Sequence, residues 1–394
     1  MAEATAVYPV LEPGFTAYHC GLANGTAYRY ETRVWRSTSG PQYPLKTDPM
    51  QTLFRLIFVS LLCLAGCESS SNSTVDTDTD PTTPANRKFE LTYGAKILDV
   101  PAGASVKVWM PVAQTSPQQE VELTNQSVPA ALQINPDAYG NQIGYFEVDQ
   151  TADAAEIDFS LQYNVTRQQA GLDDSQKTLE SNVSERFLNA NRLVPKTGKP
   201  IELLADKSVP ENPKAAGELL YQIVEDHMKY DKSKPGYGNG DSVWACDSQT
   251  GNCTDFHSLF ISLARSRDIP ARFQIGFSIP TDKPEGTIGG YHCWAWFHVN
   301  DQGWLPVDIS EADKHPEMKS FFCGNLTPDR VTFSTGRDIQ LVPASETQSL
   351  NYFVYPHVEV DGKQWPKDKI KLDFHYANMS DKPVLKSSTS NPDE

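Results

Sequence analysis

The stretch that decides the fold runs from residue 251 to residue 260 and reads Gly-Asn-Cys-Thr-Asp-Phe-His-Ser-Leu-Phe. Apolar side chains recur in it, and just beyond it, at the spacing of one helical face. These positions are Phe256, Leu259, Phe260, Leu263 and Ala264. The pattern predicts an amphipathic helix that begins at Cys253.

Cys253 stands at the point of this helix where a thiol is most easily activated. Unpaired backbone N–H groups give a helix N-terminus a partial positive charge, which favours a thiolate over a thiol. The same N–H groups can donate hydrogen bonds to the oxyanion of a tetrahedral intermediate. We therefore interpret Cys253 as the nucleophile of an acyl-transfer reaction.

Two later segments carry the residue types that such a nucleophile needs. Residues 290–296 read Gly-Tyr-His-Cys-Trp-Ala-Trp, and residues 303–308 read Gly-Trp-Leu-Pro-Val-Asp. Both segments are strand-like, so two neighbouring strands would place His292 beside Asp308. Asp308 would then orient the imidazole, and His292 would exchange protons with Cys253.

Short motifs in this order resemble the transglutaminase-like superfamily over roughly residues 215–310. The motifs are Gly251-Asn252-Cys253 at a helix start, Ile269-Pro270-Ala271-Arg272 after the helix, His292-Cys293-Trp294, and Gly303-Trp304 followed by Asp308. The resemblance implies an α+β, papain-like catalytic domain in which Cys253 is the nucleophile, His292 the base and acid, and Asp308 the orienting residue. In closer detail the chain resembles bacterial secreted members that place a small antiparallel β-sandwich domain before the catalytic domain.

The resemblance leaves two points open. Asp268 follows the helix at a position where the family usually has glycine, and aspartate tolerates the left-handed backbone conformation better than most residues. The side chain that helps to bind the oxyanion is not fixed by the sequence. The candidates are Trp244, Asn252 and Tyr230.

His257 and three further cysteines are assigned structural roles. His257 lies on the same helix as the predicted nucleophile, but His292 has the matching downstream carboxylate, so we interpret His257 as a packed histidine. Cys246, Cys293 and Cys323 would either permit one disulfide in an exported protein or remain buried thiols. A zinc site built from these cysteines and histidines would not have the spacing of zinc motifs, so we expect no metal and no cofactor.

The N-terminal part of the chain contains a predicted export signal. Residues 50–66 begin with methionine, carry one basic residue and continue into an apolar run that is too short to span a bilayer. The residues before Cys67 read Leu-Ala-Gly and resemble the lipobox of bacterial lipoproteins, which implies lipidation of Cys67 and cleavage before it. We expect residues 1–49 either not to be translated or to be disordered. Residues 67–87 are rich in Ser, Thr, Asp and Pro and predict a flexible tether.

The rest of the chain is predicted to hold two folded parts. Short alternating runs broken by turn residues predict the antiparallel β-sandwich over residues 88–167. A connecting segment follows over 168–211. Asn212-Pro213 is a good start for a helix with one apolar face, and we assign 212–378, with its C-terminal strands, to the catalytic domain. The tail over 379–394 is expected to be disordered.

The charge of the chain restricts its partners. The formal charge of −16, without a run of Lys or Arg, argues against a nucleic-acid partner. We expect peptide or protein substrates, and contact with the membrane through the lipid anchor at Cys67. Glu68, which follows the lipidated cysteine, favours an outer-membrane destination in the bacterial cell envelope, by resemblance to the sorting rule of enteric bacteria.

These observations lead to one main hypothesis and one alternative. The main hypothesis is an exported, lipid-anchored cysteine enzyme that attacks peptide or glutamine-type amide bonds through a thioester. Water as the second substrate would make it a protease or amidase, and an amine would make it a transglutaminase. The sequence does not choose between the two. The alternative is a non-catalytic binding or assembly lipoprotein of the cell envelope that retains the transglutaminase-like fold.

Overall fold

The computed structural model describes residues 16–23, 26–33, 85–149, 155–347 and 349–379. The predicted signal over 50–66, the lipidation site Cys67 and the predicted tail beyond residue 379 lie outside the described residues. In the part of the chain that is described, no helix combines the length and the apolar character needed to cross a membrane.

Two strands lie within the first 49 residues. β1 (Thr16–Ala23) and β2 (Thr26–Arg33) pair antiparallel, with Ala23 opposite Thr26. The expectation of disorder over 1–49 is corrected for these two strands, whereas the translation of this segment remains a prediction. Residues 24–25 are Asn-Gly, a dipeptide that is typical of two-residue hairpin turns. This local signal does not depend on an alternation of hydrophobic residues in the flanking segments.

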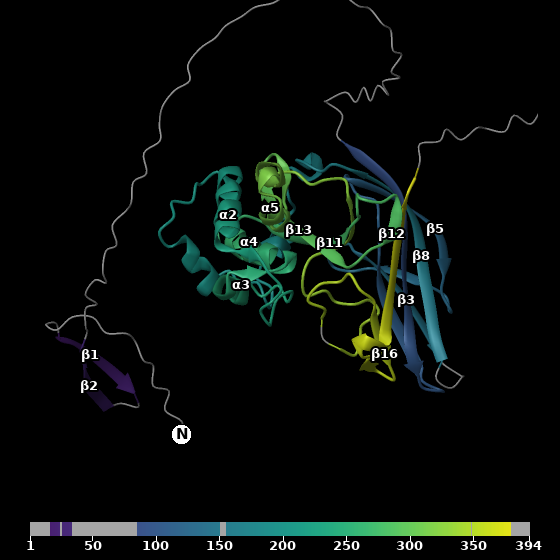
Figure 1. Cartoon of the computed structure of the whole chain (residues 1–394), viewed down its shortest axis with the longest axis horizontal. Coiled ribbons are helices and arrows are strands. Elements are labelled where there is room, and N and C mark those ends of the chain that lie inside the picture. The colour runs from purple at the N-terminus through teal and green to yellow at the C-terminus, as the bar shows by residue number, and fades with distance from the viewer. Residues whose placement is uncertain (1–15, 24–25, 34–84, 150–154, 348, 380–394) are drawn as a thin grey trace, which may run out of the picture. The chain divides into compact units, whose positions relative to one another are not determined.

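A second, compact unit begins with the β-sandwich, which has two five-stranded antiparallel sheets (Figure 1). The first sheet has the order β12 (Glu285–Thr287), β18 (Ile370–Asn378), β3 (Asn86–Val100), β8 (Ala155–Gln168) and β5 (Gln119–Ser127). The second has the order β17 (Lys363–Gln364), β16 (His357–Val360), β4 (Ser105–Val112), β7 (Gln142–Asp149) and β6 (Gln133–Pro136).

Inward-facing side chains, which alternate with outward-facing ones along each strand, hold the two sheets together. Every second residue of β8 from Ile157 to Arg167 is buried, and the apolar members are Ile157, Phe159, Leu161, Tyr163 and Val165. Phe159 meets Phe146 of β7 edge-on, with the ring centroids 5.6 Å apart. A period of two places one face of each strand in the core, so the alternating pattern in the sequence predicted this packing correctly.

The same unit contains a four-stranded antiparallel sheet that is covered by helices. The strand order is β14 (Gly303–Val307), β13 (Tyr291–Val299), β11 (Ala271–Ser278) and β15 (Arg330–Thr335). The helices are α1 (Ser181–Leu188), α2 (Pro213–His227), α3 (Ser242–Ser248), α4 (Cys253–Ser266), α5 (Ile309–Lys314) and α6 (Lys319–Phe322). Figure 1 shows α2, α3, α4 and α5 on the side of β13 and β11 that faces away from the sandwich.

Short elements connect these parts. β9 (Lys229–Tyr230) and β10 (Thr250–Gly251) pair parallel, which brings the end of α2 beside the start of α4. The 3₁₀ helices are η1 (Asp174–Gln176), η2 (Lys199–Leu204), η3 (Pro316–Met318) and η4 (Lys367–Lys369). The predicted start of α2 is confirmed, because the Asn212 side chain accepts a hydrogen bond from the Ala215 N–H at 3.0 Å.

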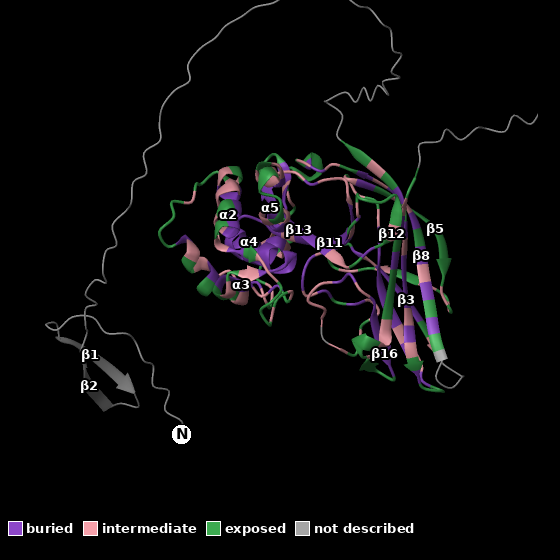
Figure 2. Cartoon of the chain, viewed as in Figure 1, coloured by how far each residue is buried: buried purple, intermediate pink, exposed green. Residues whose placement is uncertain are grey.

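Helix α4 is the centre of the helical layer. It begins at Cys253 as predicted, and a capping box between Asn252 and Asp255 satisfies its first N–H groups. The predicted apolar face is buried, but the polar face is not exposed to solvent either, because every residue from Cys253 to Arg265 is buried (Figure 2). Helices α2, α3 and α5 and strands β11 and β13 surround it on all sides. Its polar side chains are therefore paired internally; Ser258, for example, accepts a hydrogen bond from Arg337 at 2.6 Å.

The sandwich and the helix-covered sheet are fused. Strand β15 contacts both β4 and β8, and the Gln119 side chain exchanges two hydrogen bonds with the Thr332 backbone, at 2.9 and 3.0 Å. The C-terminal strands, which the sequence analysis assigned to the catalytic domain, pair instead in the sandwich: β16 with β4, and β18 with β3 and β12. One continuous apolar core extends through both parts.

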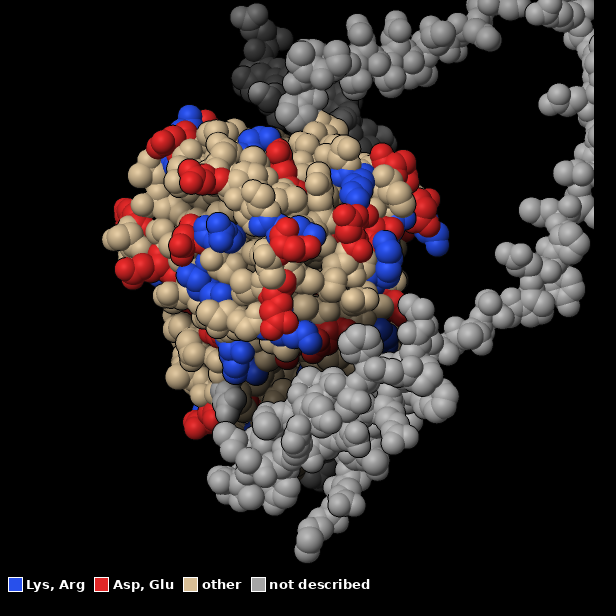
Figure 3. Space-filling view, turned by 90° about the vertical axis from the view of Figure 1, so that its left-hand side faces the viewer, with Lys and Arg blue, Asp and Glu red and all other residues tan. Residues whose placement is uncertain are grey.

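Two sequence features appear at the surface. Asp268 has a φ of 55°, so the predicted left-handed conformation after α4 is confirmed. Acidic and basic side chains are interspersed on the face that Figure 3 shows. The negative charge of the chain is therefore not gathered into one acidic patch on that face.

Candidate active site

Three elements converge on the predicted nucleophile. Cys253 is the first residue of α4, which packs against β13. His292 is the second residue of β13, and Asp308 follows β14 as the N-cap of α5. Strands β13 and β14 pair antiparallel, with Ala295 opposite Val307. The pairing of two strands thus brings together residues that are distant in the sequence.

His292 and Asp308 form a buried ion pair. The His292 Nε2–H donates to Asp308 Oδ2 at 2.7 Å, and the histidine exposes 6% of its surface. Burial by itself would lower the pKa of His292, but the charge of Asp308 and this hydrogen bond raise it to about 10. The bond to Nε2 leaves Nδ1 free to exchange a proton with a thiol.

Asp308 is anchored by several donors besides His292. Arg330 Nη1 donates to its Oδ2 at 2.8 Å, while the Ser310 hydroxyl and the Glu311 N–H donate to its Oδ1 at 3.1 and 3.2 Å. Burial would raise the pKa of this carboxyl, but the charges of His292 and Arg330 hold it well below its usual value. Asp308 is therefore a fixed anion that is poised to orient an imidazolium.

Sequence reasoning missed Arg330. It is the first residue of β15, it is 3% exposed, and its guanidinium lies 5.0 Å from the ring centroid of Trp294. Trp294 in turn contacts the His292 ring, at 6.0 Å between centroids. No local motif marks this arginine, because its role depends on the placement of β15 two strands away from β13.

Cys253 lies beside His292 and is 3% exposed. Burial alone would raise the pKa of its thiol. Hydrogen bonds with Cys293 and His292, together with the positive charge of His292, instead hold that pKa well below its usual value. The lowered pKa of Cys253 and the raised pKa of His292 both favour a thiolate–imidazolium pair, which is the state in which a cysteine attacks a carbonyl.

Cys293 and His257 complete the surroundings of this thiol. Burial raises the pKa of Cys293, so it stays a thiol that can donate to Cys253. Burial lowers the pKa of His257 to about 4, and its Nε2 accepts a hydrogen bond from the Ile309 N–H at 3.1 Å. His257 is thus a neutral, packed histidine that links α4 to the start of α5.

The residues on either side of Cys253 are tied to Tyr291, the neighbour of His292. Asn252 Nδ2 donates to the Tyr291 hydroxyl at 3.0 Å, and Thr254 Oγ1 lies 2.9 Å from the same oxygen. Asn252 Oδ1 meanwhile caps α4 by accepting from the Thr254 N–H at 2.9 Å. This network fixes the start of the helix relative to β13, and the sequence offered no signal for it.

Comparison with known proteins identifies the domain that carries this geometry. Residues 203–309 match the transglutaminase-like superfamily. These residues form a transglutaminase-like domain. It contains Cys253, His292 and Asp308, whereas Arg330 lies beyond its matched end.

Individual relatives cover different shares of the chain. An uncharacterised protein of Haemophilus influenzae is 31% identical over 183 residues, which amount to 38% of this chain and 50% of the relative, so the chain spans about half the length of that relative. A candidate cysteine protease from Cytophaga hutchinsonii superposes with a TM-score of 0.48 and 16% identity, over 75% of this chain and 98% of that one. The periplasmic domain of TgpA from Pseudomonas aeruginosa has a TM-score of 0.33 and 14% identity, over 60% of this chain and 91% of that one.

The three predicted oxyanion side chains of the transglutaminase-like domain have different surroundings. Tyr230 lies opposite Gly251 in the β9–β10 pair. Burial, and to a smaller extent the charge of Cys253, raise the pKa of the Tyr230 hydroxyl. Asn252 adjoins Cys253, but its amide donates to Tyr291. The Trp244 ring nitrogen packs against Gly236. The contacts thus bring Tyr230 and Asn252 near the thiol and direct Trp244 to the glycine-rich loop, which spans residues 234–241.

The three cysteines that the sequence left open, Cys246, Cys293 and Cys323, are free thiols in the described structure, as is Cys253. The Cys246 sulfur lies 3.8 Å from the Lys199 carbonyl oxygen. Among the described residues, no group of three or more His, Cys, Asp or Glu side chains is placed to hold a metal ion.

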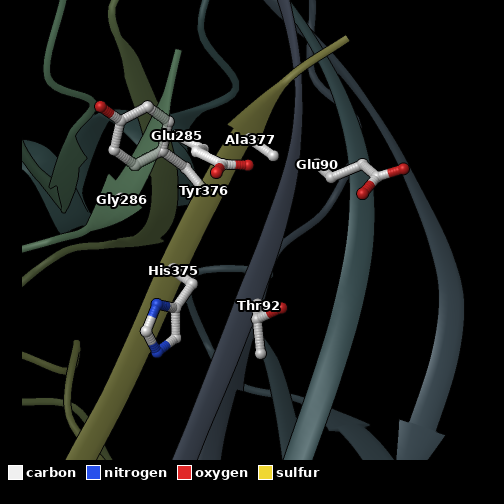
Figure 4. Close-up of a pocket in the computed structure, with 7 residues that line it drawn as sticks. All are labelled: Glu90, Thr92, Glu285, Gly286, His375, Tyr376 and Ala377. Carbon is white, nitrogen blue, oxygen red and sulfur yellow. The ribbon is translucent and has the colours of Figure 1, made fainter. Parts of the chain in front are cut away.

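A shallow pocket of about 350 Å³ lies on the sandwich, away from this site (Figure 4). Its lining comes from β3, β12 and β18 and includes Glu90, Glu285 and His375. His375 is already paired with Asp373 at 2.5 Å. The pocket shares no residue with the Cys253 site, so we assign it no part in the chemistry.

Proposed function

We propose that the protein is a cysteine enzyme that cleaves or exchanges amide bonds of peptides through a thioester on Cys253. The observation that carries the proposal is the 2.7 Å bond between His292 and Asp308 beside a thiol whose pKa is lowered. A thiolate, an imidazolium and an orienting carboxylate are the parts that acyl transfer by cysteine requires.

The reaction would proceed in two steps. The Cys253 thiolate attacks the amide carbonyl carbon, and the backbone N–H of Cys253, at the start of α4, donates a hydrogen bond to the oxyanion. His292 then gives its proton to the leaving amine as the C–N bond breaks and the thioester remains. A water or a second amine, deprotonated by His292, displaces the thiolate and releases an acid or a new amide.

Replacement of Cys253 tests this proposal. A library of glutamine-containing peptides is incubated with the protein and a primary amine, and mass spectrometry reports cleavage, deamidation and amine incorporation. Cys253→Ala should lower every such activity by at least about 10⁴-fold. Cys323→Ala removes a free thiol elsewhere and should leave activity unchanged. Full activity of Cys253→Ala would overturn the proposal.

A non-catalytic lipoprotein would give a different result with a thiol probe. An activated thiolate reacts with iodoacetamide faster than ordinary thiols at neutral pH. Rapid, selective labelling of Cys253 over Cys246 and Cys323 would therefore agree with an enzyme. Equal, slow labelling of the three would favour the non-catalytic reading.

We further propose that the enzyme is exported and anchored through a lipid on Cys67, as the lipobox-like sequence suggests. The intact mass of the protein from its native membrane should then correspond to residues 67–394 plus the lipid. A mass that includes residues 1–66, or that carries no lipid, would contradict this part of the proposal.

A further inference from the structure

A cavity of about 440 Å³ lies at the junction of the sandwich and the transglutaminase-like domain. Its lining comes from three places that are far apart in the sequence. These are Asn239 in the glycine-rich loop, the segment 350–357, and Gln364, Lys367, Ile370 and Leu372 near the last two strands. The cavity therefore exists only because the C-terminal strands return to the sandwich.

One wall of this cavity reaches the Cys253 site. Tyr352 and Tyr355 line the cavity, and their rings lie 5.6 and 5.9 Å from the ring of Tyr291. The Tyr355 hydroxyl accepts a hydrogen bond from the Tyr291 N–H at 3.1 Å. Since Tyr291 precedes His292 and bonds to both neighbours of Cys253, only one residue separates the cavity wall from the reacting groups.

The glycine-rich loop is fixed to the same wall. The Tyr352 hydroxyl donates to the Gly238 carbonyl at 3.1 Å, and Asn351 Nδ2 donates to the Asn239 carbonyl at 2.7 Å. A Cβ on Gly238 would lie 3.1 Å from Asn252 Nδ2, the amide beside the nucleophile. The loop thus connects the cavity to the start of α4 along a second path.

The lining indicates the chemistry of the ligand. Apolar groups of Leu350, Val354, Ile370 and Leu372 face the cavity together with the two tyrosines. Leu372 is 43% exposed, so its side chain is accessible to a ligand at the edge of the cavity. Lys367 is exposed and makes no side-chain hydrogen bond or ion pair with any described residue. On a chain of net charge −16, an unpaired cation beside an apolar pocket favours an acidic group next to an apolar one.

We propose that this cavity binds an apolar or aromatic side chain of the peptide substrate, with an acidic residue next to it that pairs with Lys367. The proposal rests on the proposed function. It makes the sandwich, through β17 and β18, part of substrate selection. The bound peptide would extend past Tyr291, so that an amide on the same peptide reaches Cys253.

The test uses fluorescein-labelled peptides that contain a glutamine and a Phe-Glu pair. The pair is placed one to four residues before or after the glutamine. Matched peptides carry Ala-Glu or Phe-Lys instead. Binding is measured by fluorescence anisotropy on Cys253→Ala, and turnover is measured on the active protein. Phe-Glu should bind about 10-fold or more tightly than Ala-Glu, because a buried aromatic ring contributes most of the affinity.

Two variants and one control locate the site. Lys367→Glu should weaken Phe-Glu binding about 5-fold and favour Phe-Lys, since an exposed charge pair is reversed. Leu372→Gln should weaken both Phe peptides by about 3-fold or more and leave Ala-Glu unchanged. Lys371→Glu makes the same charge change at an exposed position outside the cavity, and it should leave the Phe-Glu to Phe-Lys ratio unchanged.

The outcomes separate this inference from the proposed function. Peptide binding that depends on Lys367 and Leu372, without turnover by the active protein, would support the cavity and contradict the enzyme. Turnover that is indifferent to both substitutions would support the enzyme and overturn the cavity. No binding by any peptide of the set, or an equal effect of Lys371→Glu, would also overturn it.

Discussion

Among the described residues of the compact unit, two buried histidines form a hydrogen bond with a carboxylate, one in each part of the unit. His292 donates to Asp308 at 2.7 Å in the transglutaminase-like domain, and His357 lies 3.2 Å from Glu359 in the sandwich. The two histidines are buried to about the same extent, since His292 exposes 6% of its surface and His357 exposes 5%. Both have a hydroxyl or a thiol beside the imidazole, so composition alone does not distinguish them.

The arrangement around the two imidazoles differs. Glu359 Oε1, the Thr347 hydroxyl and the Ser345 hydroxyl all approach the same nitrogen, His357 Nε2, at 3.2, 3.1 and 3.5 Å. Asp308 takes Nε2 of His292 and leaves the opposite nitrogen for Cys253. A proton relay needs its donor and its acceptor on different nitrogens. Two features therefore distinguish the candidate active site from the structural pair. The partners of His292 lie at different nitrogens of the imidazole, and Cys253 stands at a helix N-terminus.

The largest expected effect is on turnover. Asp308→Asn keeps an N-cap for α5 but removes the charge that orients and stabilises the imidazolium. We expect kcat on the best peptide substrate to fall by about 10⁴-fold. The matched change Glu359→Gln in the sandwich should alter kcat by less than about twofold. Equal losses in the two variants, with both proteins folded by circular dichroism, would remove the distinction between the pairs.

The next largest effect is on stability. Arg330→Leu leaves the Asp308 carboxylate buried with one cation fewer, and such a loss costs about 3–5 kcal/mol of unfolding free energy. Ser345→Ala removes a neutral donor to Glu359, and we expect a loss of about 1 kcal/mol. Urea unfolding measures both values. A loss for Arg330→Leu no larger than that for Ser345→Ala would mean that the arginine does not compensate the buried charge.

A pH profile sharpens the comparison further. The pKa of Cys253 is held well below its usual value and that of His292 is raised to about 10, so the ion pair exists between these two limits. Activity should be flat through neutral pH and fall as the pH rises through about 10, where His292 loses the proton that the leaving amine needs. An activity that instead rises between pH 7 and pH 9 would indicate an ordinary thiol.

The smallest expected effect concerns Cys293. Its thiol hydrogen-bonds to Cys253 and favours the thiolate, so Cys293→Ala should raise the pKa of Cys253 by about one unit or less. The pH dependence of iodoacetamide labelling at Cys253 measures this shift. A lower pKa in the variant would show that Cys293 opposes the thiolate, contrary to its position as a donor.

Local signals were sufficient for much of the fold. The apolar spacing after Cys253 and the Asn212-Pro213 start predicted α4 and α2, because caps and periodicity act within a few residues. Alternation predicted the sandwich strands for the same reason. It also predicted that the segments of His292 and Asp308 would be adjacent strands, and β13 and β14 do pair.

Long-range contacts were beyond these signals. Strand β18 pairs with β3 from the opposite end of the folded chain. The residues of β18 do not by themselves indicate the strand with which it pairs. The helix α4 is buried on all sides because other elements close around its polar face. The sequence pattern indicated one apolar face of the helix. It did not indicate how many other elements would cover the polar face.

The sequence by itself determined the start of α4 at Cys253, the transglutaminase-like order of motifs and the left-handed Asp268, because each depends on neighbouring residues along the chain. Only the tertiary structure decided that Arg330 anchors Asp308, and that the last strands form a cavity behind Tyr291. The physical reason is that a buried charge or a cavity wall is made by chain segments that meet only after the sheets have formed.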